Sequence, residues 1–306
     1  MDSRQIPLIN LAPYFSGLME NKQQVAREIR QACEDIGFFT VSGHGVPLEL
    51  VRSTNAAARA FFDLPLDEKT KVLAKPAFGY MPMEAENLSA SLGAKAHSDL
   101  KETLNLKLPV EAVSWPSHPP ELTPTCQQYF SAMLELAGAI LHLFALALDV
   151  PETFFDDKVD RPNAVLRLIN YPPVGAAQPG QMGAGEHTDY GTITILWSED
   201  SRGLQVRTRD GAWLDVAASP EAFIINIGDL MSNWTNDRWI STLHRVTPRV
   251  NAARRQSIAF FHNPNPDAVI ECIPGCCDDA HPARYAPILA GEHLRMKAEK
   301  ALGKSV

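Results

Sequence analysis

Cysteine is scarce in this chain, with five residues among 306. So few cysteines over this length exclude a small disulfide-stabilised scaffold. Cys33 lies within an amphipathic helical pattern and is expected in the core. The other notable group, Cys272, Cys276 and Cys277, flanks a Pro-Gly pair near the C-terminus. A zinc or redox role is one reading of this group, but the pattern favours ordinary thiols in a loop.

The chain also lacks an excess of basic residues and any apolar run long enough to span a membrane. Its formal net charge of −8 argues against nucleic acid or an anionic membrane as the main partner. Residues 134–150, the longest apolar stretch, are interrupted by Glu135 and His142, so we expect a buried core helix there. The first residues show no signal-peptide pattern. We therefore expect a cytoplasmic protein, a monomer or weak homo-oligomer, whose partner is a small molecule.

The composition itself is that of an ordinary globular protein, with 45% hydrophobic and 21% charged residues. In the first half, apolar residues recur mainly at helical spacing. Helices are predicted at 21–36, 48–62 and 119–150, with a short one starting near 64, and strand-like segments are predicted at 6–11 and 37–41.

Residues 73–119 are the least regular part of the chain. A long loop in a compact domain is more often functional than idle. We expect this segment to cover the mouth of an active site.

After about residue 162 the pattern becomes strand-like, with short apolar segments separated by Gly, Asp and Asn. This spacing is typical of a β-sandwich or barrel. The sequence thus predicts a mixed α/β fold with an all-β core, namely a double-stranded β-helix (jelly-roll) barrel with flanking N-terminal helices. We expect one folding unit, in which 1–150 is mainly helical and adds two strands to the barrel, and 151–306 forms the jelly-roll core. Strands are predicted at 165–171, 185–190, 193–197, 204–207, 213–216, 223–227, 243–246 and 256–262.

A candidate metal site begins at His187 and Asp189. On a strand these two side chains project to the same face, because alternate residues share a face. His244, on a distant strand, supplies a second imidazole. Two imidazoles and one carboxylate, with coordination positions left open, form the ligand set of non-haem Fe(II) oxygenases. Any single histidine taken alone is more often structural, so the prediction rests on the combination.

A candidate anion site lies downstream at Arg255 and Ser257. If 255–261 is a strand, these side chains share one face, where an arginine fork and a hydroxyl both donate to the same carboxylate. A buried strand has little reason to carry them inward without an anionic ligand. The alternative is a structural ion pair of Arg255 with an internal Asp or Glu.

The motifs now in view resemble those of the isopenicillin N synthase-like group of Fe(II)/2-oxoglutarate-dependent dioxygenases, over nearly the whole chain. The resemblance implies Fe(II) bound by His187, Asp189 and His244, and 2-oxoglutarate held by Arg255 and Ser257 with Tyr171 nearby. It implies O2 as the oxidant, with release of succinate and CO2. The matching segments are 6–11, 37–46, 170–173, 187–189, 226–229, 234–237, 244–246 and 255–257.

Within this resemblance, Asp229 and His44 are expected to be structural. The substrate is expected to be a small organic molecule, most simply hydroxylated, and Arg167 favours one that bears a carboxylate. The residues predicted to approach it are Arg167, Phe261, Asn263, Tyr80 and Met81.

Three other functions stay open from the sequence. One is an Fe(II) oxidase without 2-oxoglutarate, as isopenicillin N synthase and aminocyclopropane-carboxylate oxidase are; there the Arg-x-Ser pair serves the substrate. Another is an ethylene-forming enzyme that fragments 2-oxoglutarate itself. The most distant is a non-catalytic sensor that binds iron and 2-oxoglutarate.

Overall fold

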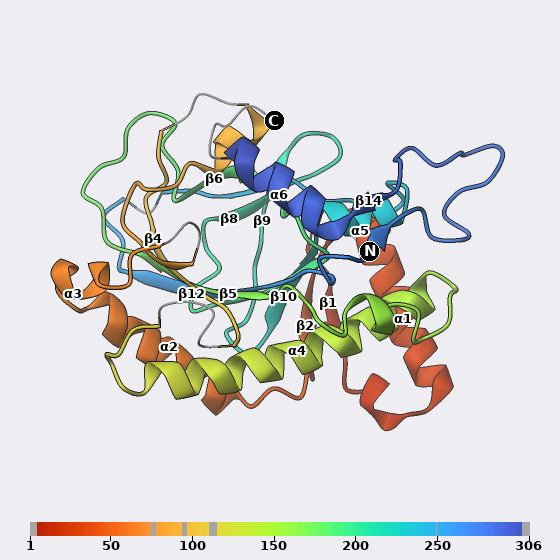
Figure 1. The fold of residues 1–306 in the computed structure, drawn as a ribbon, viewed down its shortest axis with the longest axis horizontal. Helices are drawn as coiled ribbons and strands as arrows, with labels where there is room; N and C mark the ends of the chain where they lie inside the picture. Colours follow the sequence, from red (N-terminus) through yellow and green to blue (C-terminus); the bar gives the residue numbers. More distant parts are fainter. Residues whose placement is uncertain (1–4, 75–77, 94–96, 110–114, 249, 302–306) are drawn as a thin grey trace.

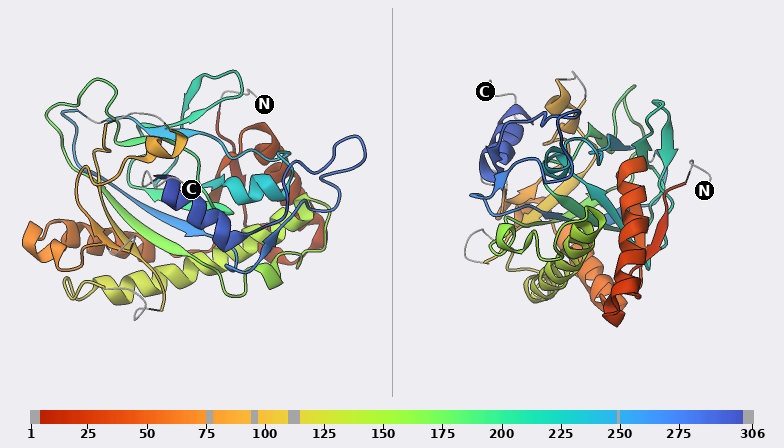
Figure 2. Two further views of the ribbon diagram at one scale, coloured as in Figure 1. Left: turned by 45° about the horizontal axis from the view of Figure 1, so that its top comes forward. Right: turned by 90° about the vertical axis from the view of Figure 1, so that its right-hand side faces the viewer.

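Two β-sheets lie face to face in the computed structural model, which describes residues 5–74, 78–93, 97–109, 115–248 and 250–301. Helices cover the outer face of the larger sheet, and α4 runs along its length (Figures 1 and 2). One apolar cluster fills the space between this sheet and the helices, and a second, smaller cluster lies between the two sheets. This layering confirms the jelly-roll architecture with N-terminal helices outside.

The large sheet has eight strands, which are antiparallel apart from the pair β1–β2. Its order is β1 (Leu8–Asn10), β2 (Phe38–Ser42), β10 (Phe223–Ile227), β7 (Ile193–Ser198), β12 (Arg255–His262), β5 (Val165–Tyr171), β4 (Glu102–Leu106) and β3 (Gly79–Met81).

The small sheet has four antiparallel strands. Its order is β6 (Ala184–His187), β11 (His244–Val246), β8 (Leu204–Arg207) and β9 (Trp213–Asp215), and a separate pair joins β13 (Val269–Ile270) to β14 (Ile288–Leu289). The helices are α1 (Met19–Asp35), α2 (Leu48–Phe62), α3 (Leu66–Thr70), α4 (Leu122–Ala147), α5 (Asp229–Trp234) and α6 (Ala290–Ala301), with 3-10 turns η1 (Tyr14–Ser16), η2 (Leu88–Leu92) and η4 (Asp156–Lys158).

Helix α4 is apolar over most of its surface because it is buried, as the sequence predicted for this stretch. By length and composition alone it could cross a membrane, yet 56% of its most apolar stretch is buried within the fold. Phe130 packs edge-on against Phe260 of β12, with ring centroids 5.0 Å apart. The helix therefore packs against the outer face of the large sheet.

Strand β12 shows how the sequence separates the two faces of this sheet. Ile258 and Phe260 belong to the helix-side core, whereas Ala259 belongs to the cluster between the sheets. Because side chains alternate along a strand, Arg255 and Ser257 share the inner face with Ala259. The predicted two-residue alternation of this segment is confirmed.

The segment 73–119 differs from its prediction as an irregular loop. It contributes β3 and β4, so the first 150 residues add four strands to the large sheet instead of two. In β4 the alternation of apolar and polar residues is hard to recognise, because the charged Glu102 shares the helix-facing side of the strand with Leu104 and Leu106. There its carboxylate meets the buried Lys69 ammonium at 2.8 Å. A charged residue at an apolar position hides the strand pattern.

Candidate metal centre and cavity

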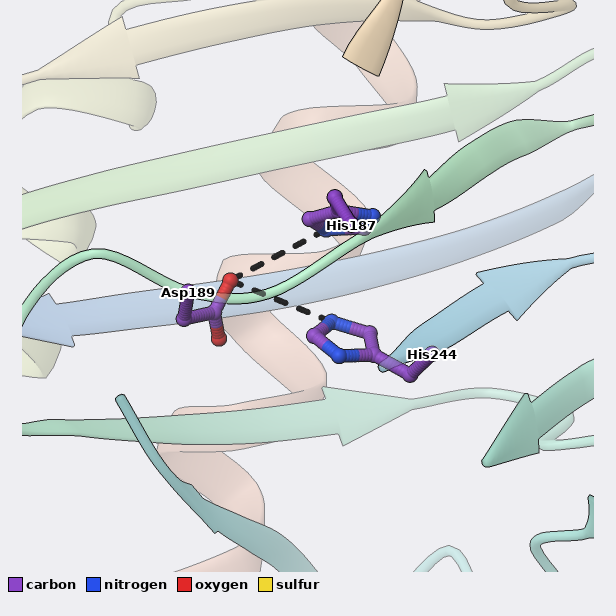
Figure 3. Close-up of side chains that lie close together, drawn as sticks. All are labelled: His187, Asp189 and His244. Atoms are coloured by element: carbon purple, nitrogen blue, oxygen red, sulfur yellow. Dashed lines mark ion pairs between the residues drawn. The ribbon is translucent and has the colours of Figure 1, made fainter. Parts of the chain in front are cut away.

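His187 and His244 are direct partners across the antiparallel strands β6 and β11. Asp189 follows β6 by two residues, and all three side chains converge in Figure 3. The Asp189 Oδ1 atom lies 3.8 Å from the Nε2 atom of each histidine. Among the described residues, this is the one cluster of three or more His, Cys, Asp or Glu side chains whose ligand atoms converge closely enough to hold a metal ion.

The two histidines are held in one tautomer by backbone carbonyls. Nδ1 of His187 lies 2.7 Å from the Gly185 carbonyl oxygen, and Nδ1 of His244 lies 3.1 Å from that of Thr242. A carbonyl can only accept, so each Nδ1 carries a proton, and Nε2 is the nitrogen of each ring that is left to bind a metal. Burial, with His244 nearby, lowers the pKa of His187 to about 3, so its imidazole is neutral, as a metal ligand must be.

Asp189 is oriented by two donors on its other oxygen. Oδ2 accepts hydrogen bonds from Thr194 Oγ1 at 2.5 Å and from Asn226 Nδ2 at 2.7 Å, which leaves Oδ1 facing the histidines. Burial opposes ionisation of Asp189, but the positive charge that either histidine carries when protonated, together with these hydrogen bonds, brings its pKa below the ordinary value. Two neutral nitrogens and one carboxylate oxygen on one side of an otherwise open space fit Fe(II).

Asn226 and Thr194 were not assigned to the site from the sequence. Sequence features could have pointed to both residues. Asn226 belongs to the Asn-Ile-Gly-Asp motif, and Thr194 is a polar residue between two buried isoleucines of β7. Hydrogen bonds of this kind fix a ligand's orientation and its basicity.

Replacing Asn226 by alanine is expected to weaken metal binding by roughly 10- to 100-fold, the effect usual for outer partners of a metal ligand. Isothermal titration with Fe(II) under anaerobic conditions, or with Mn(II), measures this directly. Asn21→Ala, in helix α1 outside the cavity, is the matched control. Equal affinity in both variants would contradict the role given to Asn226.

Arg255 is almost completely buried, at 1% exposure, and is held rigidly. Its Nε donates to Ser198 Oγ at 3.2 Å, its Nη1 donates to the Arg202 carbonyl at 3.3 Å, and its guanidinium lies 4.8 Å from the centre of the Tyr171 ring. Ser257 Oγ is buried without a hydrogen-bond partner among the described residues. The hydroxyl and the guanidinium therefore share an inner face where a carboxylate would satisfy both.

A cavity between the two sheets joins the metal cluster to this anion site. Its walls are mostly apolar, and Lys101, Arg167, Asp189 and Arg255 are its charged lining residues other than histidine. The lining comprises Phe38, Leu88, Lys101, Arg167, Ile169, Tyr171, Ala184, His187, Asp189, Thr194, Leu196, Leu204, Asn226, His244, Val246, Arg255, Ser257, Ala259 and Phe261.

Of the predicted substrate residues, some line the cavity and others do not. Arg167 and Phe261 line the cavity, and the Arg167 guanidinium lies 5.5 Å from the centre of the Phe261 ring. Met81 is not among the lining residues, and its sulfur lies 3.6 Å from Asn105 Nδ2.

The other two predicted substrate residues, Tyr80 and Asn263, have contacts elsewhere in this structure. Tyr80 points to the helix side, where its hydroxyl donates to Glu102 at 2.5 Å and its ring packs against Phe61. Asn263 lies just beyond the end of β12, and its amide donates to the Asn163 carbonyl at 2.7 Å. Neither side chain lines the cavity.

Asp229 and His44 have structural contacts, as expected. Asp229 accepts hydrogen bonds from Ser241 and Thr188 and forms an ion pair with Lys297 of α6 at 2.6 Å. His44 lies 3.2 Å from the Glu221 carbonyl and accepts from the Val46 amide. Both side chains make structural contacts, and neither is among the residues that line the cavity.

Comparison with known proteins agrees with this geometry. Residues 6–126 match the family model described as non-haem dioxygenase in morphine synthesis N-terminal, and residues 162–264 match that of the 2OG-Fe(II) oxygenase superfamily. The 2-oxoglutarate-Fe(II) type oxidoreductase hxnY of Emericella nidulans is 33% identical over 98% of this chain and 91% of its own length. Homoarginine-6-hydroxylase 2-ODD-233 of Oryza sativa subsp. japonica is 32% identical over 97% of both chains.

Among solved structures, a full-length Neurospora crassa protein in complex with alpha-KG superposes with a TM-score of 0.88 and 29% identity, over 97% of this chain and 98% of that one. The chain belongs to the 2OG-Fe(II) oxygenase superfamily. It is a non-haem dioxygenase that depends on Fe(II), 2-oxoglutarate and O2.

Proposed function

We propose that this enzyme oxidises, most simply by hydroxylation, a small organic substrate that bears a carboxylate, with His187, Asp189 and His244 as the iron ligands. The convergence of these three side chains on one open space carries the proposal. When bound, Fe(II) with 2-oxoglutarate supplies the O2-dependent oxidation, with release of succinate and CO2. The protein's own part is to hold, orient and desolvate the reactants.

The distal carboxylate of 2-oxoglutarate is assigned to Arg255 and Ser257. The planar guanidinium fork of Arg255 matches a carboxylate and is held in place by Ser198 and Arg202. Ser257 contributes a buried hydroxyl that otherwise lacks a partner among the described residues. The Tyr171 ring lies beside the guanidinium and limits its tilt. The cosubstrate is thereby oriented before reaction, which removes the entropic cost of finding that pose.

The apolar walls of the cavity keep the reacting groups dry. Phe38 and Leu196 on the large sheet face Leu204 and Val246 on the small one. Excluding water strengthens each electrostatic contact inside, including those of Asp189 and Arg255.

The assignment of a carboxylate-bearing substrate rests on Arg167. Its guanidinium lies over Phe261 at the cavity wall, four residues before Tyr171 on β5. The names of relatives are compatible with such a substrate: two are homoarginine-6-hydroxylases, and a structurally similar rice enzyme is a dioxygenase for auxin oxidation.

The test is a mass-spectrometric screen of small carboxylic acids, amino acids and phenolics with Fe(II) and 2-oxoglutarate, scored by substrate-dependent succinate. The expected product carries one added oxygen atom, with one succinate formed per turnover. Substrate oxidation without succinate would instead indicate the oxidase type, and ethylene in the headspace would indicate fragmentation of 2-oxoglutarate. Binding of both iron and 2-oxoglutarate without O2 uptake would indicate a sensor.

A further inference from the structure

A buried lysine, Lys101, faces the cavity and has no part in holding the metal or 2-oxoglutarate as assigned above. It lies just before β4, and its side chain is only 2% exposed. Its Nζ lies 2.8 Å from Asp99 Oδ2 and 3.4 Å from Glu86 Oε2. Burial opposes its charge, but these two carboxylates raise the pKa of Lys101 above its ordinary value. Lys101 is therefore a fixed cation in the cavity wall.

Glu86 joins this lysine to Arg167. One carboxylate oxygen lies 3.3 Å from Arg167 Nη2 and the other lies 3.4 Å from Lys101 Nζ. Burial opposes ionisation of Glu86, yet Arg167 and Lys101 lower its pKa to about 2, so the carboxylate is ionised. Arg167 is also held from the side, because its Nε donates to Asn105 Oδ1 at 2.8 Å. Both cations thus have fixed positions.

The two cations line the cavity, whereas Glu86 does not. An ammonium has three donors and a guanidinium has five. The contacts to Glu86, Asp99 and Asn105 engage only some of them. Both cations therefore reach the cavity, and the Glu86 carboxylate that bridges them is not among the residues that line it.

Arg167 is set apart along the sheet from the anion site at Arg255. Lys101 precedes Glu102, which pairs with Asn170, so its backbone is level with Tyr171, and Glu86 connects its ammonium to Arg167. Arg255 is paired in register with Tyr171, whereas Arg167 is paired with Ala259, four residues further along. Four residues of strand span roughly 13 Å. Arg167 and Arg255 therefore line different levels of the cavity, and we assign a separate anionic group to each.

The geometry assigns Lys101 and Arg167 as a two-cation site for a carboxylate of the primary substrate, with Glu86 as the positioning residue that sets their spacing. This assignment rests on the proposed function and deepens it, since it predicts that the enzyme selects organic acids over their neutral analogues. Asp99 ties the site to the metal centre, because its Oδ1 accepts a hydrogen bond from the Gly185 amide at 2.9 Å, and the Gly185 carbonyl accepts from His187. The substrate's acid group is thereby placed at a set distance from the metal.

The test compares acids with their primary amides in five proteins: wild type, Lys101→Met, Arg167→Gln, Glu86→Gln and the control Lys107→Met. Lys107 is bonded to Asn163 at 2.6 Å and does not line the cavity. The probes are homoarginine, auxin and phenylacetate with their amides, and the uncharged thymine. Two quantities are measured: the ligand-induced shift in Tm of the iron-free protein in the presence of 2-oxoglutarate, and the KM values for acid and for 2-oxoglutarate.

In wild type and in Lys107→Met, at least one acid is expected to raise Tm more than its amide and more than thymine. In Lys101→Met and Arg167→Gln this preference is expected to disappear, and the KM for the acid is expected to rise roughly 30-fold, the effect of removing one partner from a buried charge contact. The KM for 2-oxoglutarate should change far less than the KM for the acid. Glu86→Gln, which keeps the shape of the side chain, is expected to weaken acid binding without removing it.

Equal Tm shifts with acid and amide across the panel in wild type would overturn the two-cation site. So would a rise in the KM for 2-oxoglutarate that matches or exceeds the rise for the acid in Lys101→Met, since Lys101 would then serve the cosubstrate. If Lys101→Met does not fold because Asp99 loses its partner, the Tm shifts and KM values of Arg167→Gln provide the same test. The Tm measurement needs no turnover, so a wild-type enzyme that forms no succinate contradicts the proposed function and leaves this site to be judged by binding.

Discussion

Replacing Asp189 by alanine is expected to abolish succinate formation, a loss of about three orders of magnitude or more, because the only carboxylate of the proposed ligand set is removed. The two remaining imidazoles carry no charge to balance a divalent ion. The loss should appear both in 2-oxoglutarate turnover without added substrate and in metal affinity measured by titration.

The fold should survive this substitution. Thr194 and Asn226 lose their acceptor, at a cost of about 1–3 kcal/mol for each unsatisfied group, but a buried negative charge disappears as well. Circular dichroism and Tm check this point. Asp215→Ala, at the end of β9 and outside the cavity, is the matched control and should retain full turnover. Metal-dependent turnover that persists in a folded Asp189→Ala enzyme would remove the proposed ligand set.

Replacing Arg255 by glutamine is expected to raise the KM for 2-oxoglutarate roughly 30-fold or more, as for the truncation of one partner in a buried charged hydrogen bond. Glutamine retains a donor but neither the charge nor the fork that faces Ser257. The effect should fall on the KM for 2-oxoglutarate more than on the KM for the primary substrate, which steady-state kinetics with each varied in turn will show.

Two further variants sharpen this result. Arg255→Lys keeps the charge and loses the fork, so it should give an intermediate KM. Arg245→Gln removes a guanidinium that stacks 3.8 Å from the Trp213 ring and does not line the cavity, so it should leave the KM for 2-oxoglutarate unchanged. An unchanged KM for 2-oxoglutarate in Arg255→Gln would indicate that Arg255 binds the primary substrate instead, and would favour the oxidase type.

The sequence was most informative where one face of a strand is uniformly apolar. In β7 and β10, buried isoleucines mark the strands clearly. His187 and Asp189 were predicted to share a face of a strand over 185–190; their side chains do converge, but β6 ends at His187, so Asp189 reaches the cluster from the segment after the strand. The pairing of His187 with His244 across β6 and β11 is a long-range register that spacing alone does not fix. It came instead from the resemblance of the motifs.

The sequence was least informative in the segment that holds β3 and β4. Glu102 of β4 occupies a core position because Lys69 of helix α3 neutralises it, a contact that local patterning cannot show. The same limit applies to Lys101, whose cavity position depends on Glu86 and Asp99.

Tyr80 and Asn263 lie outside the cavity lining for two different geometric reasons. Tyr80 has the opposite parity on its strand, since it pairs with Leu104, which faces the helices. Asn263 would have shared the face of Arg255 only if β12 had continued, but the strand ends at His262. An alternation argument holds only within the bounds of the strand.

A crystal structure of the protein with Fe(II) and 2-oxoglutarate, grown without O2, tests the central claim most directly. We expect one metal ion bound by His187 Nε2, Asp189 Oδ1 and His244 Nε2, with 2-oxoglutarate in the adjoining positions and its distal carboxylate on Arg255 and Ser257. A metal bound elsewhere, or a closed site with no coordination position left for ligands, would contradict it.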